Sequence, residues 1–491
     1  MADNRPLRGI AAIAAGLLAG AALPPLGWPP LLWLALVPLW ALGPWSAALW
    51  GAAAVLISHR WLLGLHPLDW VGVPLPLSLP LCLLLLAGCG LLGGLLVACW
   101  RWLVQRLGPE RWATALLAAA LWGLAEVLLA KGPLFWIGLG AAALPGDPLL
   151  AGLAQLVGAG GLAAVELLLG WGLWRVLVLW HGRRVVPWRA AMAWLLGVAL
   201  LHGLGWQRLA AVAAPPLASA SSPRALLVLQ PAIPTRRKFD ADQQLLMLRQ
   251  LDHALDQAER LGSAALLLPE GALPLGQSLP RPAAVEVLSG GFRLVGEQLR
   301  SALLAFPPGA QDAATAAAVD KHRLVPLGEW IPGAGLMRWA GLSAVGGVDP
   351  GPASRLLRRP AGPVAVAICY EIADGQALAS ASREGAQWLV ASANLDPYPL
   401  QLQEQFSALA QLRAIEAGRW LVSSANTGPS LVVDAAGVVR QRLPPGRAGT
   451  LAASVQPRWE LTPYSRWGEA PLVLTAVVSL LVLWRVRVRR C

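Results

Sequence analysis

Charged residues are scarce in this sequence. Asp, Glu, Lys and Arg together make up 13% of its 491 positions, whereas hydrophobic residues make up 56% and the mean hydropathy is +0.56. A soluble globular chain usually carries about 25% charged residues. The scarcity therefore excludes an ordinary soluble protein and indicates an integral membrane protein. The 25 tryptophans fit this class, because indole rings favour the membrane–water interface.

Cysteine and histidine are also few, and their positions exclude two kinds of site. Cys369 is the one cysteine in the polar part of the chain, because Cys82, Cys89 and Cys99 share one apolar stretch and Cys491 is the last residue. No disulfide can therefore form within the polar part. The six histidines are scattered, with no pair at metal-ligand spacing, so we expect no metal site and no cofactor.

Apolar stretches predict eight transmembrane helices, seven before the polar part and one after it. They cover about 9–23, 31–42, 46–65, 75–104, 112–130, 149–180, 189–206 and 471–484. The first two are short for a bilayer, and we expect them to form a tilted hairpin.

Arginines cluster in alternate short loops between these stretches, and this bias predicts the orientation of the chain. Groups of arginines lie between the fourth and fifth stretches, between the sixth and seventh, and after the eighth. The other loops hold little beyond Arg60 and Lys131. We therefore expect both termini in the cytoplasm and residues from about 207 to 469 on the outer face. The net charge of +12 comes largely from these loops and does not indicate a nucleic-acid partner.

The polar part begins with a linker of small residues and then alternates strand-like and helix-like patterns. Strands are predicted over 225–230, 264–268, 364–368, 388–392, 420–424 and 430–433, helices over 241–261 and 403–417, and a loop over 307–319. This alternation favours an α/β domain with a largely buried sheet. The predicted divisions are a membrane domain (1–207), a linker (208–223), the α/β domain (224–469), and a last span with a basic tail (470–491).

Three ionisable residues stand at strand ends or loop entries in the α/β domain. Cys369 follows the apolar strand 364–368, a usual place for a nucleophile, and Glu270 ends another strand. Lys321 is one of only three lysines in an arginine-rich chain, which suggests that a compact point charge is required there. Together they offer a nucleophile, a base, and a cation that stabilises an oxyanion and favours the thiolate. The alternatives are a buried cysteine that acts only as a small hydrophobe, and ordinary ion pairs.

In this order, and between the seventh and eighth spans, the three residues resemble those of the apolipoprotein N-acyltransferase family. The most specific segments are 321–332 (KHRLVPLGEWIP) and 368–371 (ICYE), and weaker ones are 229–234, 268–271, 413–419 and 462–468. The resemblance implies a bundle of eight membrane helices joined to a nitrilase-like αββα sandwich. It implies catalytic roles for Glu270, Lys321 and Cys369, and supporting roles for Glu329, Tyr370, Glu371 and Asn394.

The resemblance also implies a reaction. The thiolate of Cys369 attacks an ester of a membrane phospholipid, and the thioester then passes its acyl chain to the α-amine of an apolipoprotein's diacylglyceryl-cysteine. This N-acylation is the last step of lipoprotein maturation. The implied enzyme is an acyltransferase of the bacterial inner membrane with its catalytic domain in the periplasm. Its partners are the phospholipid donor, the apolipoprotein acceptor and the bilayer.

The chain departs from the family's pattern beyond the cysteine. Residues 392–399 (SANLDPYP) keep Asn394 but put Pro397 where the family has a tryptophan, and Phe406 stands in place of a histidine. These changes concern the shape of a lid and the recognition of the acceptor. Apolar residues near Leu336, Met337 and Trp339 are candidates for that lid, and equally for a core.

Other functions stay open at this point. One is a membrane-anchored nitrilase-like amidase, or an acyltransferase with a different amine acceptor. A second is a non-catalytic lipid- or lipoprotein-binding protein, although such a protein would be expected to lose part of the Glu–Lys–Cys set. A third is a transporter. The scarcity of charged residues within the spans, mainly Glu126 and Glu166, argues against it.

Overall fold

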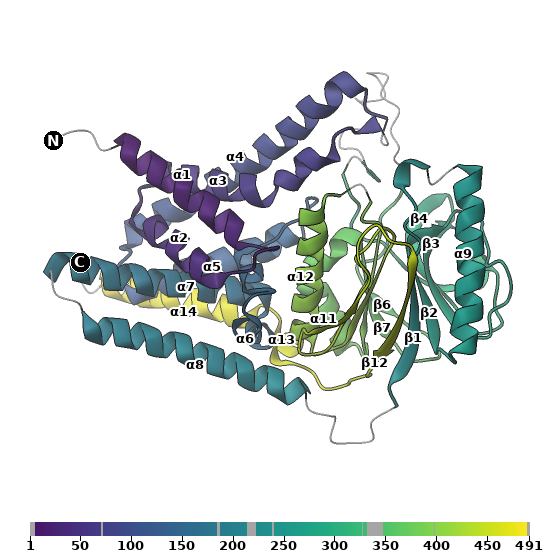
Figure 1. Ribbon diagram of the computed structural model, residues 1–491. Coiled ribbons are helices and arrows are strands. Elements are labelled where there is room, and N and C mark those ends of the chain that lie inside the picture. The colour runs from purple at the N-terminus through teal and green to yellow at the C-terminus, as the bar shows by residue number, and fades with distance from the viewer. Residues whose placement is uncertain are drawn as a thin grey trace.

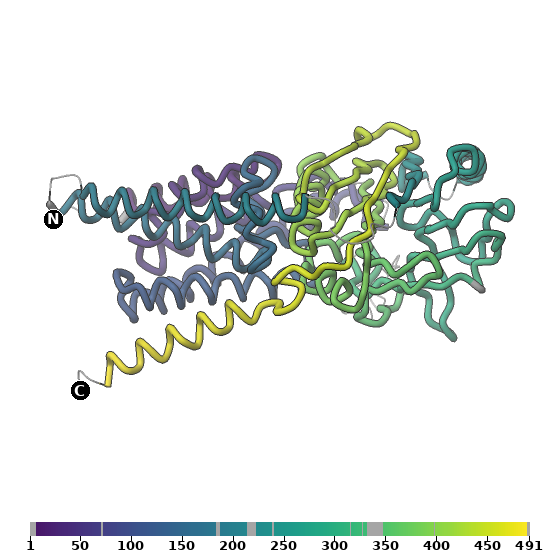
Figure 2. Tube along the Cα trace, turned by 90° about the horizontal axis from the view of Figure 1, so that it is seen from below, coloured from purple at the N-terminus to yellow at the C-terminus, as the bar shows by residue number. Residues whose placement is uncertain are grey.

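The structure, a computed structural model, describes residues 5–69, 72–183, 187–213, 222–237, 240–326, 328–330, 347–396 and 398–488. A bundle of apolar helices lies beside an α/β domain of two stacked sheets (Figure 1). The beginning of α1 (Arg5–Ala22) and the end of α14 (Ala470–Val488) both lie at the end of the bundle that is far from the sheets (Figures 1 and 2). The predicted lid residues 336, 337 and 339, and Pro397, lie outside the described residues.

The helical part contains two kinds of helix. Besides α1 and α14, it is built from α2 (Pro29–Ala41), α3 (Pro44–Ser58), η1 (Arg60–Leu65), α4 (Leu75–Leu107), α5 (Trp112–Ala130), η3 (Leu139–Ala143), α6 (Pro148–Ala151), α7 (Ala154–Arg183) and α8 (Trp188–Ala213). Among the described residues, five helices are long and apolar enough to cross a membrane: α4, α5, α7, α8 and α14. The apolar parts of α1, α2 and α3 are shorter than the roughly 20 residues that a bilayer requires. The structure thus shows a membrane bundle but does not confirm the predicted count of eight spans.

Small residues allow α3 and α4 to pack closely. A Cβ added to Gly94 would lie 3.0 Å from the carbonyl oxygen of Ala48, and one added to Gly90 would lie 2.9 Å from the side chain of Leu56. Backbones that approach this closely gain van der Waals contact, which is a main source of helix association in lipid. The glycine pair of α4 therefore lies in a helix interface.

The α/β domain contains two six-stranded sheets, in the orders β12-β1-β2-β3-β4-β5 and β11-β10-β9-β8-β7-β6. The strands of the first sheet are β1 (Arg224–Gln230), β2 (Ala265–Leu273), β3 (Glu286–Val295), β4 (Gln298–Phe306), β5 (Ala317–Asp320) and β12 (Gly449–Val455). Those of the second are β6 (Leu356–Leu357), β7 (Val364–Ile368), β8 (Leu389–Ala393), β9 (Leu421–Ala425), β10 (Leu431–Val433) and β11 (Val439–Arg442). The central strands β1–β3 and β7–β9 run parallel within their sheets.

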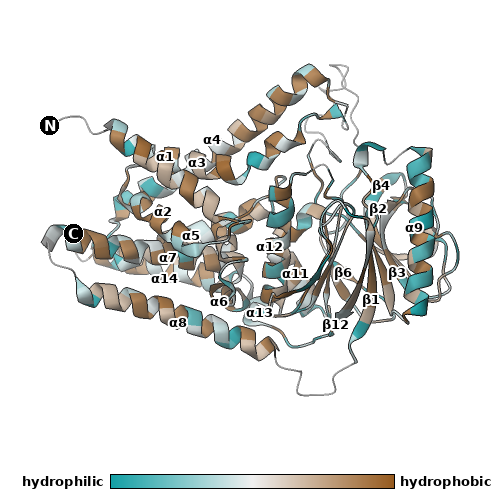
Figure 3. Ribbon diagram, viewed as in Figure 1, coloured by the Kyte–Doolittle hydropathy of each residue, from teal (hydrophilic) through white to brown (hydrophobic). Residues whose placement is uncertain are grey.

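Side-chain alternation explains the four layers of this domain. In β1, Leu226 and Val228 belong to the core between the sheets, while Leu227 and Leu229 pack towards α9 (Ala241–Arg260). Strands buried on both faces read as continuous apolar runs, as β7 does. The second sheet is covered by α11 (Gly375–Arg383) and α12 (Leu400–Ala417), so the layers are helix, sheet, sheet and helix. In Figure 3 hydrophobic colour covers much of the long helices of the bundle, whereas α9 shows hydrophilic and hydrophobic colour in alternation.

Several elements differ from the sequence predictions. The strands β3, β4, β6, β11 and β12 were not predicted. β6 has only two residues, two adjacent glycines interrupt the apolar pattern of β3, and β4, β11 and β12 contain polar or exposed residues. The end of the predicted loop 307–319 is the start of β5, which pairs with β4. Glu270 lies inside β2 rather than at its end, at a point where the register with β3 shifts.

The second sheet's helices attach the domain to the bundle. On α12, a carboxylate oxygen of Glu416 accepts a hydrogen bond of 2.7 Å from the backbone N–H of Ala159 in α7, and the amide of Gln405 donates to the carbonyl of Ser58 at 3.0 Å. Phe406, next to Gln405, is fully buried. Arg323 donates to the carbonyl of Ala130 at the end of α5. The α/β domain therefore lies directly against one end of the bundle.

Candidate active site

Cys369 has the backbone geometry of a nucleophile held on a sharp turn. It follows β7, in which every residue is buried, and begins the short 3-10 helix η6 (Cys369–Ala373). Its φ is +52°, a left-handed value that residues other than glycine rarely adopt. Such strain persists only where the surroundings enforce it, and it is common at active sites. Cys369 thus stands at a strand-to-helix turn, a position that nucleophiles occupy in other α/β enzymes.

Lys321 lies between two carboxylates. Its Nζ is 2.7 Å from Oε1 of Glu270 and 2.8 Å from Oε1 of Glu329. The lysine side chain is only 1% exposed, and the two glutamates are 10% and 18% exposed. The remaining oxygens also have partners, since Oε2 of Glu270 accepts from the N–H of Asn394 and that of Glu329 from the N–H of Val325. The ammonium group is therefore fixed rather than mobile.

These contacts set the charge states of the cluster. Burial alone would lower the pKa of Lys321, but the carboxylates of Glu270 and Glu329 outweigh it and raise that pKa well above its ordinary value. Burial raises the pKa of Glu329, and the charge of Lys321 only partly offsets this. Lys321 therefore stays protonated at neutral pH.

The sulfur is a thiol at rest. Burial, followed by the negative charge of Glu270, raises the pKa of Cys369 well above its ordinary value, although Lys321 acts in the opposite direction. We expected Lys321 to favour the thiolate; its charge has that sign, but burial and Glu270 outweigh it. A thiol in this state reacts only if a base removes its proton.

The residues named by sequence reasoning fall into two sets. A cavity of about 140 Å³ is lined by Cys369, Glu270, Lys321, Glu329 and Asn394. The other lining residues used below are Thr235, Phe292, Asp396 and Tyr398. Tyr370 and Glu371, which follow the cysteine in η6, are not among the residues that line this cavity. The sequence thus brings five of its seven candidates to one cavity.

Tyr370 points towards the membrane part. Its ring centroid is 5.3 Å from that of Phe135, which follows α5, and 5.9 Å from that of Tyr398. Trp61 of η1 packs against both Phe135 and Tyr398. These four side chains form an aromatic cluster that connects the residues around the cysteine with the end of the bundle.

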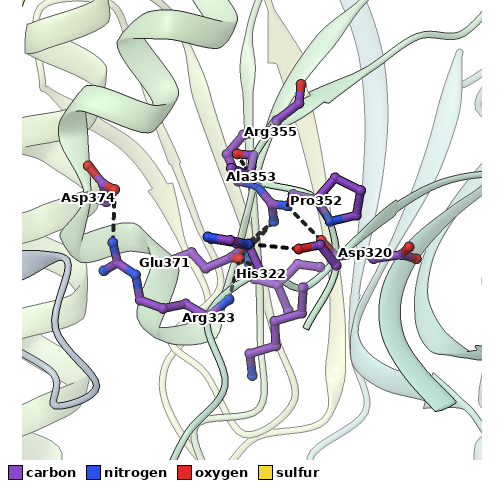
Figure 4. Close-up of polar contacts among 12 residues, drawn as sticks. Asp320, His322, Arg323, Pro352, Ala353, Arg355, Glu371 and Asp374 are labelled. Carbon is purple, nitrogen blue, oxygen red and sulfur yellow. Dashed lines mark hydrogen bonds and ion pairs between the residues drawn. The ribbon is translucent and has the colours of Figure 1, made fainter. Parts of the chain in front are cut away.

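Glu371 forms a buried ion pair with Arg355 (Figure 4). The Nη1 of Arg355 lies 2.8 Å from each oxygen of the Glu371 carboxylate, and its Nη2 donates to the carbonyl of Asp320 at 2.7 Å. Glu371 also accepts from the N–H groups of His322, Arg323 and Ile368. The pair thus ties the residue after Lys321 to the strand before Cys369.

Arg355 was missed by sequence reasoning. It lies among many arginines, outside every motif, and only its burial at 3% side-chain exposure distinguishes it. Its neighbour Arg323 pairs with Asp374 at 2.8 Å, also in Figure 4. Arg355 could have been found by asking which cation pairs with Glu371, because a buried glutamate requires a positive partner.

Within the described residues, no group of three or more His, Cys, Asp or Glu side chains has an arrangement suited to a metal ion. The chemistry that the cavity itself offers is that of a thiol, carboxylates and an ammonium group.

Two family models match the chain. Residues 310–464 match the carbon-nitrogen hydrolase model, and residues 15–171 match the model of the apolipoprotein N-acyltransferase N-terminal domain. The fold and these matches define a nitrilase-like hydrolase domain joined to a membrane domain.

Curated relatives identify the family. An apolipoprotein N-acyltransferase of Prochlorococcus marinus is 50% identical over 439 residues, covering 87% of this chain and 86% of the relative. One of Parasynechococcus marenigrum is 49% identical, covering 84% and 86%. Among solved structures, an amidase from Nesterenkonia sp. AN1 is 20% identical with a TM-score of 0.38, covering 52% of this chain and 97% of that chain. The chain belongs to the apolipoprotein N-acyltransferase family and is an acyltransferase.

The pKa of Cys369 leads to a first prediction. Without a lipid donor, we expect the rate of alkylation by iodoacetamide to show no titration step up to about pH 8.5, the ordinary value of a cysteine thiol, because burial disfavours the thiolate. Mass spectrometry of the Cys369 peptide at a series of pH values measures this rate. A step near pH 7 would show that a thiolate forms at rest.

A second prediction concerns the buried Arg355–Glu371 pair. Arg355→Gln removes one partner and leaves a buried carboxylate, so we expect a loss of about 3–5 kcal/mol of stability. The exposed Arg358→Gln is the matched control. Thermal unfolding in detergent, followed by tryptophan fluorescence, measures both variants. Equal unfolding temperatures would contradict the structural role given to Arg355.

Proposed function

We propose that the cavity around Cys369 is the catalytic centre of a phospholipid-dependent N-acyltransferase. The substrates are a membrane phospholipid, as acyl donor, and the α-amine of an apolipoprotein's diacylglyceryl-cysteine, as acceptor. The observation that supports this is the placement of Lys321 at 2.7 and 2.8 Å from Glu270 and Glu329, on the same cavity as a strained cysteine. A thiol, a base and a fixed cation are the groups that acyl transfer through a thioester requires.

The first half of the reaction forms the thioester. Glu270 takes the proton of the Cys369 thiol, and the sulfur forms a bond with the ester carbonyl carbon of the phospholipid. The ammonium of Lys321 stabilises the negative oxygen of the tetrahedral intermediate, because it is already oriented and desolvated. The carbon–oxygen bond then breaks, and the proton held by Glu270 passes to the departing oxygen of the lysophospholipid. Glu329 holds Lys321 in place during both steps.

The location of the domain suits lipid substrates. The domain lies against one end of the helical bundle, and the aromatic cluster around Tyr370 joins the domain to the bundle. Both substrates carry acyl chains that stay in the bilayer, so the reacting ester and amine must be reached at the membrane surface. A buried thioester is also protected from water, which would otherwise hydrolyse it.

The proposed topology has eight spans, with α1, α2 and α3 as short or tilted ones. In it, 1–207 form the membrane domain, 208–223 a linker, 224–469 the periplasmic catalytic domain, and 470–491 the last span and a cytoplasmic tail. Support comes from the arginine bias and from the common position of the start of α1 and the end of α14, far from the sheets.

The function leads to a third prediction. After incubation with phospholipid, we expect intact-mass spectrometry to show one added fatty-acyl group on Cys369 that hydroxylamine removes. A diacylglyceryl-cysteine peptide should also remove it and become N-acylated. Cys369→Ala should abolish the adduct, whereas Cys99→Ala, which changes an exposed cysteine in α4, should not.

The same assay tests Lys321 and the competing functions. Lys321→Ala should slow thioester formation by roughly a hundredfold, as the loss of an oxyanion donor does elsewhere. Wild-type turnover in that variant would contradict its role. A thioester that the peptide leaves unchanged would indicate another acceptor, and hydrolysis of an amide without any lipid would indicate an amidase.

The orientation leads to a fourth prediction. In a background without native cysteines, Gln298→Cys on β4 and Gln105→Cys near the end of α4 place exposed thiols on the two proposed sides. In spheroplasts, an impermeant maleimide should label the former at once and the latter only after lysis. The reverse pattern would overturn the orientation.

A further inference from the structure

Asp396 is a carboxylate in the catalytic cavity that the acylation step does not use. It lines the same cavity as Cys369, and its Oδ2 accepts a hydrogen bond of 2.6 Å from the backbone N–H of Thr235. Within the described part of the chain, no Lys, Arg or His side chain forms an ion pair with Asp396, whereas Glu270 and Glu329 share Lys321. Asp396 is therefore a carboxylate of the cavity that has no cationic side chain as a partner among the described residues.

The charges of the cavity favour a positively charged ligand. With all groups ionised, Glu270, Glu329 and Asp396 contribute three negative charges against one positive charge from Lys321. Protonation of Glu329, which burial favours, still leaves an excess of one negative charge. Two aromatic side chains, Phe292 and Tyr398, line the same cavity, and aromatic faces attract ammonium groups.

We propose that Asp396 and these two aromatic side chains form a subsite for a primary ammonium group, the protonated α-amine of the acceptor. The inference rests on the proposed function and adds to it the residue that recognises the acceptor. An α-amine has an ordinary pKa of about 8, so it enters largely as the ammonium at neutral pH. A charge-assisted hydrogen bond to Asp396 then holds it beside the thioester.

The bound ammonium reacts in two proton transfers. One proton leaves to water, and the free electron pair on nitrogen attacks the thioester carbonyl carbon, with Lys321 stabilising the oxyanion. Glu270 takes the second proton from nitrogen as the carbon–sulfur bond breaks, and returns it to the sulfur of Cys369. The products are an amide and a thiol, and one proton has been released to solvent.

A purely structural role for Asp396 is the competing explanation. The hydrogen bond from Thr235 anchors the start of the 3-10 helix η4 (Thr235–Arg237), and Thr235 Oγ1 in turn accepts from the amide of Asn394 at 3.0 Å. An asparagine at position 396 keeps an oxygen that accepts from Thr235 but loses the charge. Asp396→Asn therefore separates recognition of the ammonium from positioning of the loop.

The experiment measures the two half-reactions separately on the full-length protein in detergent. Thioester formation is followed by intact mass, and transfer to a diacylglyceryl-cysteine peptide by loss of the acyl adduct. For Asp396→Asn we expect an unchanged rate of thioester formation and a KM for the peptide raised by about tenfold or more, since a hydrogen bond to a charged group is lost. Asp396→Glu should recover most of the loss.

A peptide whose α-amine is replaced by a hydroxyl group serves as a competitor. It should inhibit wild type and Asp396→Asn equally, because it carries no ammonium. Asp252→Asn, on α9 outside the cavity, is the matched control and should behave as wild type. Equal peptide KM in wild type and Asp396→Asn, or a defect seen only in Asp396→Ala, would overturn the subsite. Absence of a thioester in wild type would instead overturn the proposed function itself.

Discussion

A single buried ammonium group organises the catalytic half of this protein. Removing a lysine charge from water costs several kcal/mol, and only well-placed opposite charges offset that cost. In this chain the two carboxylates come from β2 and from the segment after β5, so Lys321 joins parts of the first sheet that are far apart in sequence. The same contacts that stabilise the lysine therefore fix the proposed base, Glu270, and the proposed oxyanion donor, Lys321, relative to one another. Burial and the negative charge of Glu270 raise the pKa of Cys369 and keep it a thiol, which is why the cysteine needs a base.

A second ion pair lies behind the first and serves a different purpose. Arg355 and Glu371 make no contact with the cavity, but they bind the backbone directly after Lys321 and directly before Cys369. Strand β5 belongs to one sheet and β7 to the other, so the pair links the two sheets where Lys321 and Cys369 follow these strands. Positioning in catalysis is sensitive at the scale of an ångström. A rigid, buried pair at this point is a physical means of holding that distance.

The sequence allowed the class of fold to be predicted, together with most central strands and the residues that gather at the cavity. These inferences depended on local signals: the apolar run before Cys369, the rarity of lysine, and segment matches to a family. The sequence did not allow prediction of elements that lack such a local signal and depend on distant partners. Strand β3 contains the adjacent glycines Gly290 and Gly291, β4 begins with polar, partly exposed residues, and Arg355 is marked only by burial. The position of Glu270 within β2 depends on Gly290, since a Cβ there would lie 2.4 Å from the carbonyl of Pro269. No local sequence pattern predicts such a contact.

The size of the cavity limits what can be recognised in it. At about 140 Å³ it is well below the roughly 300–1,000 Å³ that enclose a drug-sized ligand. This volume suits the reacting ester or amine better than a whole acyl chain. The two proposed substrates are alike in their lipid parts, and one difference between their reacting groups is charge, since the ester is neutral and the ammonium is positive. A carboxylate that is free of Lys321 is the simplest means by which such a site distinguishes an ammonium from a neutral ester.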